Sequence, residues 1–432
     1  MDKGSSNYQD RFIRKALSVY DAEQVIIEQV KRESIELVTI EHAYMRRSAQ
    51  TITASAPVPH FRRSVMDGYA VRAQDTINAS VEHPVKLRII AVVDCGAAWS
   101  GQLQEGEAVR IMTGAMVPSG ADAVVKLEQT SDMEQGAHGL DDEVSVKEEA
   151  QVGDFIHDEG IEIKQGTMLI DKGDVIEAGN MALLAMFGHS YINVYSAPKV
   201  AVIPTGHELL SVEAQLEPGK IRNSNSYLLS GLIRDAGGEP HLLPALPDDV
   251  DALASRIEDA MQEYDAVITI GGVSVGDRDV LYAYTQQWKG KLLFNKVKMR
   301  PGGPTTAGVY HDKLLFALSG NPSSCFVGFE MFVRPALLQM QGVKTPDRVR
   351  LRAKLASDYL VKDTVVRLVR GILYADERGG LMVREAGLDS SNATITIRDA
   401  NALIVIPPSE QDWAAGTVVD VIPVGRHSIK NR

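Results

Sequence analysis

Cysteine is scarce in this sequence. Only two of the 432 residues are cysteines, Cys95 and Cys325, and they lie far apart. Their number and spacing exclude a disulfide-rich scaffold and a zinc site built from cysteine pairs. We expect Cys325 to act as a small apolar residue of the core rather than as a reactive thiol.

Long apolar runs and basic tracts are also missing. No stretch approaches the about 20 apolar residues that a membrane-spanning helix needs, and the polar N-terminus lacks the apolar centre of a signal peptide. The formal net charge of −12 argues against general binding to nucleic acid or to an anionic membrane surface. We therefore expect a cytoplasmic protein, in which any anion site needs a local cluster of Lys and Arg.

The length of 432 residues predicts about three domains. Residues 1–15 have the polar composition of a loose tail, and residues 21–31 have the spacing of an amphipathic helix. From about 52 to 150, short apolar runs separated by Gly, Pro and Asp predict strands. After about 345 the same pattern returns, which indicates a small β-barrel or sandwich.

Residues 198–340 alternate between predicted strands and predicted helices, the pattern of an open, mostly parallel α/β sheet. The expected strands are residues 200–204, 241–246, 266–270 and 313–318. The expected helices are residues 224–238 and 249–264, followed by two that begin at about 279 and 325. A proline weakens the strand at 241–246.

Polar turns follow each of these four strands. They are Thr205–Glu208, Pro247–Asp249, Gly271–Asp277 and Ser319–Ser324. Any one of them is more simply explained as fold punctuation, because turns favour these residue types. In an open α/β sheet, however, ligands bind outside the carboxyl ends of the strands. Four such turns on one edge therefore favour a binding site.

Two of the turns suit a phosphate group, GGVSVG (271–276) and SGNPSS (319–324). Glycines let backbone N–H groups approach an anion, and a helix N-terminus adds unpaired donors and a favourable dipole. Neither turn follows the Walker pattern or the dinucleotide-binding pattern. We therefore predict a phosphate-bearing ligand without assigning it to either of those classes.

A cluster of cations lies in the segment LLFNKVKMRPGGPTTAG (292–308). If residues 292–300 form one strand, Lys296, Lys298 and Arg300 share one face of it. Solvated strand charge is the simpler explanation, above all for Lys298. In an acidic protein, three cations before a rigid Pro-Gly-Gly-Pro turn favour an oxyanion site, and the planar fork of Arg suits two oxygens.

Three carboxylates, Glu208, Asp248 and Asp279, follow strands on the same edge. Carboxylates repel a phosphate unless a cation bridges them, and Mg²⁺ is the hard cation that proteins commonly share between the two groups. We therefore predict a Mg²⁺ site. For Asp248 and Asp279 the alternative role is a helix N-cap, because both lie close to predicted helix starts.

Seven motifs occur in the order that is typical of one protein family. They are SVMDGYAV (64–71), RIMTGAMVPSGADAVVKLEQT (110–130), TGHEL (205–209), IRNSNSYLL (221–229), GGVSVGDRD (271–279), RPGGPT (300–305) and SGNPSS (319–324). Through them, roughly residues 20–425 resemble the molybdopterin molybdenumtransferases, the family of the bacterial MoeA protein and of the C-terminal domain of gephyrin. Taken together, these motifs are highly specific.

The resemblance implies an activity and an architecture. Enzymes of this family insert molybdenum from molybdate into adenylylated molybdopterin and release AMP, with Mg²⁺ as the bridging cation. They form homodimers of elongated four-domain subunits, with the site between subunits, and a molybdopterin adenylyltransferase is a further expected partner. The scarcity of cysteine agrees with this activity, because the pterin supplies the sulfur ligands. The expected parts are a loose tail (1–20), an elongated arm (21–52 with 151–190), a β-rich domain (53–150), a molybdopterin-binding α/β domain (191–342) and a C-terminal β-barrel (343–432).

The resemblance also implies roles for individual residues. The expected catalytic residues are Asp67, Glu208, Asp248, Asp279, Lys296 and Arg300, of which Glu208, Asp248 and Asp279 are the expected metal ligands. The residues expected to bind the pterin and its phosphates are Thr113, Gly114, Thr205, Gly206, Gly271, Gly272, Ser274, Gly276, Pro301, Gly320, Asn321, Pro322 and Ser324. Asp67 would come from the partner chain. Without the resemblance, Asp67 and Thr113 would be interpreted as turn residues.

Some residues depart from the family pattern at positions that carry charge. Arg300 and Gly303 stand where the family's KPGKP has two lysines, and His207 stands where its TGDEL has an aspartate. Two further departures, in the predicted arm, are His157 and Glu162. Lys298 could replace the charge lost at Gly303. The departures leave an alternative function: a paralogue that binds molybdopterin as a scaffold, carrier or sensor, or one that prefers another oxyanion such as tungstate.

Overall fold

The computed structural model of the chain describes residues 16–30, 34–132, 139–247, 249–272, 284, 288–344, 346, 349–425 and 430–431. The chain forms two compact units. Unit 1 contains residues 1–49, 172–177 and 191–432, and unit 2 contains residues 50–171 and 178–190. Each unit has hydrophobic cores of its own. The finer division into five parts stays a prediction. Within the described ranges, no helix has both the length and the apolar character to cross a bilayer.

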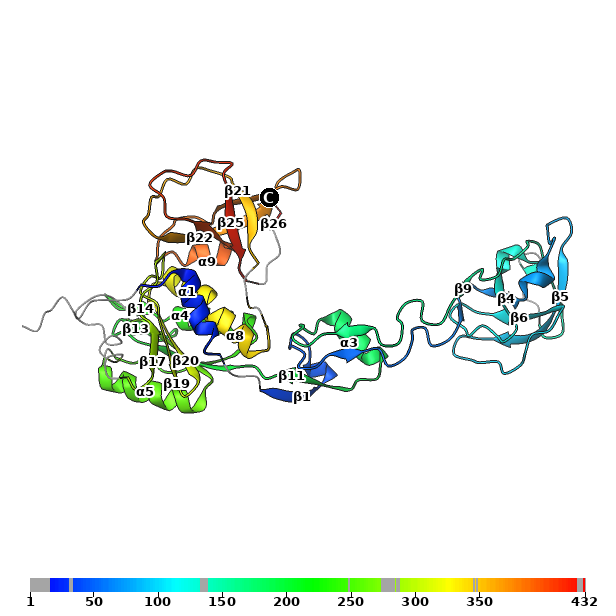
Figure 1. The fold of residues 1–432 in the computed structure, drawn as a ribbon, viewed down its shortest axis with the longest axis horizontal. Helices are drawn as coiled ribbons and strands as arrows, with labels where there is room; N and C mark the ends of the chain where they lie inside the picture. The colour runs from blue at the N-terminus through cyan, green and yellow to red at the C-terminus, as the bar shows by residue number, and fades with distance from the viewer. Residues whose placement is uncertain are drawn as a thin grey trace, which may run out of the picture. The chain divides into compact units, whose positions relative to one another are not determined.

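A six-stranded sheet forms the centre of unit 1, in the order β15-β12-β16-β20-β19-β17 (Figure 1). Its strands are β12 (Lys199–Pro204), β15 (Glu239–Leu242), β16 (Ala266–Ile270), β17 (Lys291–Phe294), β19 (Thr306–Tyr310) and β20 (Lys313–Leu318). The first four strands in this order run parallel, whereas β19 and β17 are antiparallel to their neighbours. The predicted open, mostly parallel sheet is confirmed, and the carboxyl ends of four strands share one edge.

Helices cover both faces of this sheet (Figure 1). They are α1 (Val19–Ile27), α4 (Asn225–Asp235), α5 (Val250–Glu263), α7 (Pro322–Gly328) and α8 (Arg334–Met340). α5 packs on one face through Leu253 and Ile257, in contact with Val267 of β16. The other helices share a core with the opposite face, on which Ile268 lies. Because both faces are buried, the strands are continuous apolar runs rather than alternating ones.

The helical run after β20 changes its pitch in the middle. The π-helical turn η5 spans Phe329–Val333, between the end of α7 and the start of α8. Pro335 has no N–H to close an α-helical hydrogen bond, which is a physical reason for the wider turn before it. Within this turn the buried Glu330 accepts two hydrogen bonds from Arg334, at 2.8 and 2.9 Å.

The C-terminal part of unit 1 forms the predicted small β-barrel. Its strands are β21 (Leu351–Leu355), β22 (Val366–Ala375), β23 (Leu381–Glu385), β24 (Ala402–Ile406) and β25 (Val418–Pro423). The pairing β22-β23-β21-β25-β24 closes because β24 also pairs with β22. β26 (Lys430–Asn431) pairs with β22 as well, and the short helix α9 (Ile395–Asp399) precedes β24. Closure leaves no free sheet edge in the five-strand ring.

Unit 2 is β-rich, as predicted. Its main sheet has the order β7-β4-β6-β5-β8. These strands are β4 (Gly68–Val71), β5 (Val85–Val93), β6 (Glu107–Ile111), β7 (Ala123–Lys126) and β8 (Glu143–Val146). Further elements of unit 2 are β2 (Ile52–Thr53), β3 (Arg63–Ser64), η3 (Ala73–Thr76), η4 (Leu127–Gln129), β9 (Ile156–His157), β10 (Met168–Ile170) and α3 (Ala178–Met186).

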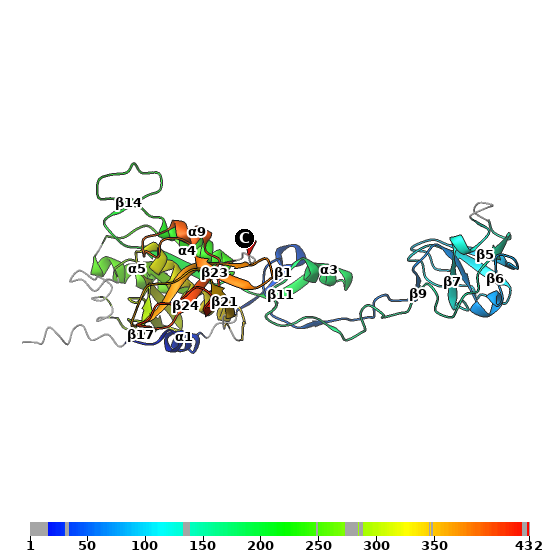
Figure 2. The ribbon, with the colours of Figure 1, turned by 90° about the horizontal axis from the view of Figure 1, so that it is seen from above.

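Two small sheets complete the described part of unit 1. β1 (Ile35–Thr39) pairs antiparallel with β11 (Tyr191–Tyr195), and the 3₁₀ turn η2 (Ile40–His42) follows β1. β13 (Leu209–Leu210) pairs with β14 (Ile221–Arg222). Figure 2 shows the chain between β13 and β14 as a loop that projects beyond the central sheet.

Two of the predicted strands need correction. Residues 292–300 do not form one strand: β17 belongs to the central sheet, whereas β18 (Met299–Arg300) pairs with β22 of the barrel. Between them, Val297 forms a bridge with Leu17. The strand expected at 241–246 instead spans Glu239–Leu242, because Pro244 cannot donate to a ladder.

Candidate functional site

The carboxyl-end edge of the central sheet contains a small pocket, here called the strand-end pocket. It has a volume of about 70 Å³. Its lining includes Thr205, Glu208, Asn223, Asn225, Gly320 and Pro322. Thr205 follows β12 and Gly320 follows β20, so the structure brings together residues from two of the four predicted turns.

Close backbone approach explains the glycine that follows β16. Gly271 has a φ of +94°, and a Cβ atom there would lie 2.8 Å from the carbonyl oxygen of Thr205. The Gly271 N–H donates to the carbonyl of Leu318 (3.0 Å), and the Thr205 hydroxyl donates to that of Ile270 (3.1 Å). The turns after three parallel strands are thus packed against one another, and a side chain at Gly271 would separate them.

Asn225 is a site residue that the sequence did not predict. Its side-chain N–H donates to the carbonyl of Gly320 at 2.7 Å, so α4 is tied to the turn after β20. Its side-chain oxygen is buried and has no hydrogen-bond partner among the described residues. A buried acceptor without a partner is costly unless a ligand or water satisfies it. In the motif IRNSNSYLL, Asn225 has the sequence features of a helix start and nothing that distinguishes a ligand contact.

The turn SGNPSS lies between two cavities. Gly320 and Pro322 line the strand-end pocket, whereas Ser324 lines a second and larger cavity. The N–H of Ser323 donates to the carbonyl of Ser391 in the barrel segment, at 3.0 Å. Part of the helix start that we expected to bind phosphate is therefore used to hold the barrel.

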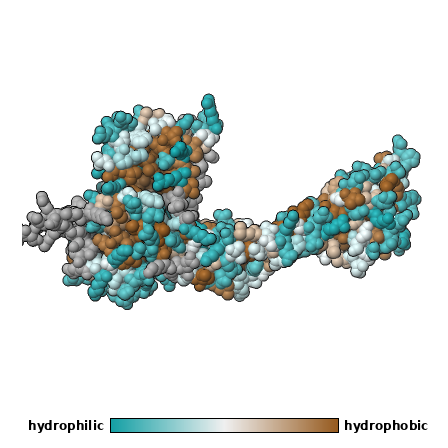
Figure 3. Space-filling model, viewed as in Figure 1, coloured by the Kyte–Doolittle hydropathy of each residue, from teal (hydrophilic) through white to brown (hydrophobic). Residues whose placement is uncertain are grey.

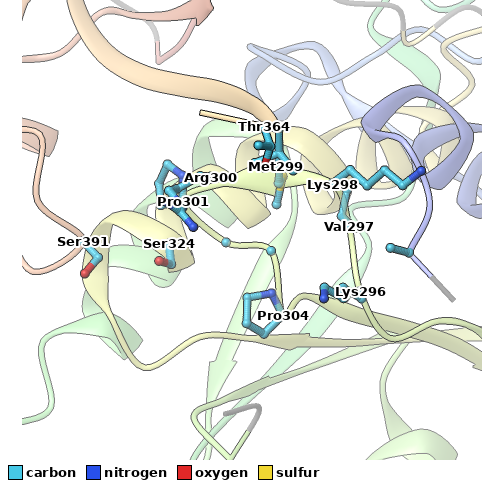
Figure 4. Close-up of a pocket in the computed structure, with 14 residues that line it drawn as sticks. Lys296, Val297, Lys298, Met299, Arg300, Pro301, Pro304, Ser324, Thr364 and Ser391 are labelled. Atoms are coloured by element: carbon cyan, nitrogen blue, oxygen red, sulfur yellow. The ribbon is translucent and has the colours of Figure 1, made fainter. Parts of the chain in front are cut away.

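The second cavity, here called the junction cavity, lies between the α/β part of unit 1 and the barrel (Figure 4). Its volume is about 770 Å³. One wall is formed by residues 296–304, which include the predicted site residues Lys296, Arg300 and Pro301. The barrel segment contributes Thr364, Val365 and Ser391, and Ala16 lines the cavity just before α1. A cavity of this size accommodates a small-molecule ligand.

Arg300 is held at the junction cavity by the barrel. Its backbone lies in β18, where Arg300 is paired with Arg367 of β22. Its guanidinium Nη1 lies 3.2 Å from the Asp363 carboxylate. The sequence did not predict Asp363, because nothing in its local sequence distinguishes it from a turn aspartate.

The Lys298 side chain does not point toward Arg300 (Figure 4). Figure 4 shows the Lys298 side chain extending toward α1, away from Arg300 and Pro301. The backbone of this stretch is held by Leu17, which donates to the carbonyl of Lys296 (3.2 Å) and accepts from the N–H of Lys298 (2.8 Å). Lys298 as a replacement for a lysine at Gly303 therefore stays a prediction without geometric support.

Asp67 and Thr113, both in unit 2, contact each other. The backbone N–H and the hydroxyl of Thr113 each donate to the same Asp67 carboxylate oxygen, at 2.7 Å. The backbone hydrogen bond and then the hydroxyl hold the pKa of Asp67 below its ordinary value. Gly114 follows with a φ of +82°. The carboxylate is thus ionised, oriented and exposed at one turn of unit 2.

Four predicted site residues, Asp248, Ser274, Gly276 and Asp279, lie outside the described residues. The described part of the chain contains no cluster of three His, Cys, Asp or Glu side chains that could hold a metal ion. Of the predicted Mg²⁺ ligands, only Glu208 is described, in the strand-end pocket. The N-cap of α5 is Asp249, which accepts a hydrogen bond from the N–H of Ala252 at 2.7 Å.

Comparison with known proteins gives the same family along the whole chain. Residues 17–188 match the MoeA N-terminal region (domains I and II), residues 201–339 match a probable molybdopterin binding domain, and residues 352–424 match the MoeA C-terminal region (domain IV). These three matches follow one another in the order of the MoeA domains.

Individual relatives are similar over nearly their full length. The chain is 40% identical to a molybdopterin molybdenumtransferase of Bacillus subtilis over 409 residues, 95% of this chain and 94% of the relative. It is 37% identical to one of Staphylococcus aureus, over 95% of this chain and 96% of the relative. A solved MoeA protein of Pyrococcus horikoshii has a TM-score of 0.80 at 30% identity, covering 95% of this chain and 99% of that protein. The chain belongs to the molybdopterin molybdenumtransferase (MoeA) family.

Proposed function

We propose that this chain is a molybdenum insertase, which transfers molybdenum from molybdate to adenylylated molybdopterin and releases AMP. Relatives with this printed name at 37–40% identity over 95% of the chain support the proposal. The observation that carries it is the SGNPSS turn, which borders the strand-end pocket on one side and the cationic junction cavity on the other. A ligand lying along this turn would place its phosphates at the sheet edge and its metal-accepting end toward the oxyanion.

The carboxyl-end edge of the central sheet is the proposed site of the pterin nucleotide, and the strand-end pocket at this edge would hold one small group of it. Backbone N–H groups and the glycine turns suit its phosphates, and the unpartnered oxygen of Asn225 offers an acceptor to an N–H or O–H group of the ligand. The proposed contacts are Thr205, Gly206, Gly271, Gly272, Ser274, Gly276, Gly320, Asn321, Pro322 and Ser324. Thr113 and Gly114 join them from unit 2 in the dimer proposed below.

Molybdate is the proposed substrate of the junction cavity. Lys296 and Arg300 supply positive charge there, and Pro301 continues the same wall. The guanidinium uses one nitrogen for Asp363, and the rest of its fork matches two oxygens of an oxyanion. The charge lost at Gly303 is not needed if this fork holds the oxyanion.

Glu208, Asp248 and Asp279 are the proposed ligands of Mg²⁺. Oxygen donors at the edge that binds phosphate fit this hard cation, although Glu208 alone is described. Bound Mg²⁺ would supply charge stabilisation to the phosphoryl oxygens during adenylate cleavage. The carboxylate of Glu208 lies over Gly206, where a Cβ atom would come within 2.6 Å of it, so the absence of a side chain at Gly206 leaves room for this acid.

A homodimer is the proposed assembly. Ile35, Leu37 and Tyr191 all point to one face of the two-stranded sheet β1/β11 and are all exposed. Hydrophobic side chains also reach the surface near β1 on the face shown in Figure 3. Exposed apolar side chains gathered on one face favour association. In the dimer, Asp67 of one chain would act at the pockets of the other. A cytoplasmic location and an adenylyltransferase partner stay predictions.

The test is a turnover assay with the purified full-length protein, adenylylated molybdopterin, Mg²⁺ and molybdate, in which AMP and pterin-bound molybdenum are both measured. We expect molybdate-dependent AMP release with one molybdenum incorporated per AMP. Asp279→Asn should abolish most of this release, whereas the control Asp259→Asn, an exposed acid on α5, should keep the wild-type rate. Tight pterin binding without AMP release would contradict the proposal and favour a carrier or sensor.

A further inference from the structure

The ion pair between Arg300 and Asp363 joins the two walls of the junction cavity. Arg300 comes from the wall formed by residues 296–304, and Asp363 precedes β22 of the barrel. Their side chains approach to 3.2 Å, and Arg300 remains 63% exposed while Asp363 is only 7% exposed. The contact is therefore between a fixed, buried carboxylate and a long side chain that reaches into the cavity.

Asp363 is held in place from several directions. One carboxylate oxygen accepts from the backbone N–H of Thr364 at 2.8 Å, and the other accepts from Nη1 of Arg367 at 2.9 Å. Arg367 is itself fixed, because it donates to the hydroxyl of Tyr359 at 2.7 Å and pairs with Asp389. These hydrogen bonds prevent the Asp363 carboxylate from moving with the Arg300 side chain. The carboxylate is therefore a fixed point of contact for the Arg300 guanidinium.

The charges show that Asp363 does not cancel the charge of Arg300. Asp363 already has a guanidinium partner in Arg367, which is closer to it than Arg300 is. Arg367 and Arg370 also pair with Asp389, so three guanidinium groups share two carboxylates, and this network keeps a net positive charge beside Lys296. Nη1 of Arg300 lies 3.2 Å from Asp363, and because the Arg300 side chain is 63% exposed, its fork keeps donors for an anion.

We propose that Asp363 is a positioning residue for oxyanion binding: it fixes the Arg300 guanidinium at the wall of the junction cavity, with the free part of its fork toward the ligand. This inference rests on the proposed function of the cavity. The backbone of Arg300 is already fixed by the pairing of β18 with β22, so Asp363 restricts the remaining freedom of the side chain. A side chain that is ordered before binding loses less entropy on binding.

Molybdate binding to the intact protein tests the proposal by calorimetry, with molybdate alone as the titrant. We expect Asp363→Asn to raise the molybdate Kd about three- to tenfold, since the fork is then disordered before binding. Asp363→Glu, which keeps the charge but moves the carboxylate, should give a smaller increase. In turnover, the KM for molybdate should rise while the KM for adenylylated molybdopterin stays unchanged. Thermal unfolding of each variant shows whether it is folded.

Two further comparisons separate positioning from general support of the barrel. In an Arg300→Gln background, Asp363→Asn should have no further effect on the molybdate Kd, because the residue acts through Arg300. Asp389→Asn perturbs the same buried network without a contact to Arg300 and should leave the Kd within about twofold of wild type. Additive effects of Arg300→Gln and Asp363→Asn on the molybdate Kd would overturn the proposal. So would an Asp389→Asn variant that raises this Kd as much as Asp363→Asn does.

The outcomes also separate this proposal from the proposed function. If the wild-type protein binds molybdate and Asp363→Asn weakens this binding, but the wild-type protein releases no AMP, the positioning role is supported and the proposed insertase activity is wrong. If AMP is released and the variant binds molybdate as tightly as wild type, the activity stands and positioning fails. Tighter binding in Asp363→Asn would show that the carboxylate competes with the oxyanion, which also overturns positioning.

Discussion

The two cysteines illustrate how burial controls the chemistry of a single residue. Cys325 is fully buried in α7, and burial raises the pKa of its thiol to about 12. Cys95 is exposed in unit 2. Because the thiolate is the nucleophile, a buried thiol that keeps its proton does not react. This agrees with the core role predicted for Cys325.

A thiol titration checks this difference. In native wild-type protein at pH 8, we expect a disulfide reagent to label Cys95 rapidly and Cys325 only after denaturation in urea. Cys95→Ser should therefore show no rapid labelling. The folded protein keeps the Cys325 proton that the unfolded chain loses at about pH 8.5, so this contribution to stability is fully present below about pH 8.5 and is lost progressively as the pH rises toward about 12. Rapid labelling of two thiols in the native state would contradict the assignment.

At the residue scale, the sequence predicted those site residues whose positions follow from sheet geometry. Thr205, Glu208 and Gly320 follow parallel strands, and parallel strands end at one edge, so their meeting in the strand-end pocket could be expected. Asp363 could not be predicted, since its contact with Arg300 exists only because β18 joins the barrel. Asn225 was visible as a helix start, but its unpartnered oxygen is a property of the fold.

At the scale of the element, helix α5 is stabilised by an N-cap. Asp249, its N-cap, accepts from the N–H of Ala252 at 2.7 Å. We expect Asp249→Ala to lower the free energy of unfolding by about 1 kcal/mol, while Asp249→Asn, which also accepts this hydrogen bond, retains most of it. Trp288 packs against the same core as α5, so urea denaturation followed by tryptophan fluorescence, in a protein in which Trp288 is the one remaining tryptophan, measures the change. Equal stability of Asp249→Ala and wild type would exclude the cap.

Strands and helices that are buried on both faces were predictable as elements, because apolar runs of the right length bounded by Gly and Asp have few alternatives. β12, β16 and β20 lie where the sequence predicted them. The prediction of one strand over residues 292–300 was wrong, because alternation of charged and apolar residues indicates an extended chain but not the strand with which it pairs. Its first half pairs with β19 and its last two residues pair with β22, so the chain leaves one sheet and enters another.

At the scale of the whole chain, the family and the types of sheet were predictable, whereas the pairings that bring distant segments together were not. The motifs in order along the sequence indicate the MoeA family, and the matches to its regions agree. β1 and β11, however, lie far apart in the sequence and form one small sheet. A pairing of this kind depends on the path of the whole chain, which local patterns do not record. The same pairing creates the apolar face on which the proposed dimer rests.

The exposed apolar face of the β1/β11 sheet predicts the oligomeric state of the protein. Leu37 of β1 is 63% exposed, and Ile35 and Tyr191 lie on the same face. We expect the wild-type protein to scatter light as a dimer of the 47.0 kDa chain, and Leu37→Glu to scatter as a monomer, because a charge in a buried interface is costly. Leu140→Glu is the matched control: Leu140 is a leucine in a turn of unit 2 with 61% exposure, away from the β1/β11 sheet in the sequence, so the dimer should persist.

The same variants test whether the dimer is needed for activity. If the partner's Asp67 completes the site, monomeric Leu37→Glu should bind molybdate with the wild-type Kd but release little AMP, since the junction cavity belongs to one chain and the Asp67 turn to the other. Leu140→Glu should do both at wild-type levels. A monomeric Leu37→Glu protein with full AMP release would show that one chain suffices for activity. A Leu37→Glu protein that remains a dimer would show that the interface lies elsewhere.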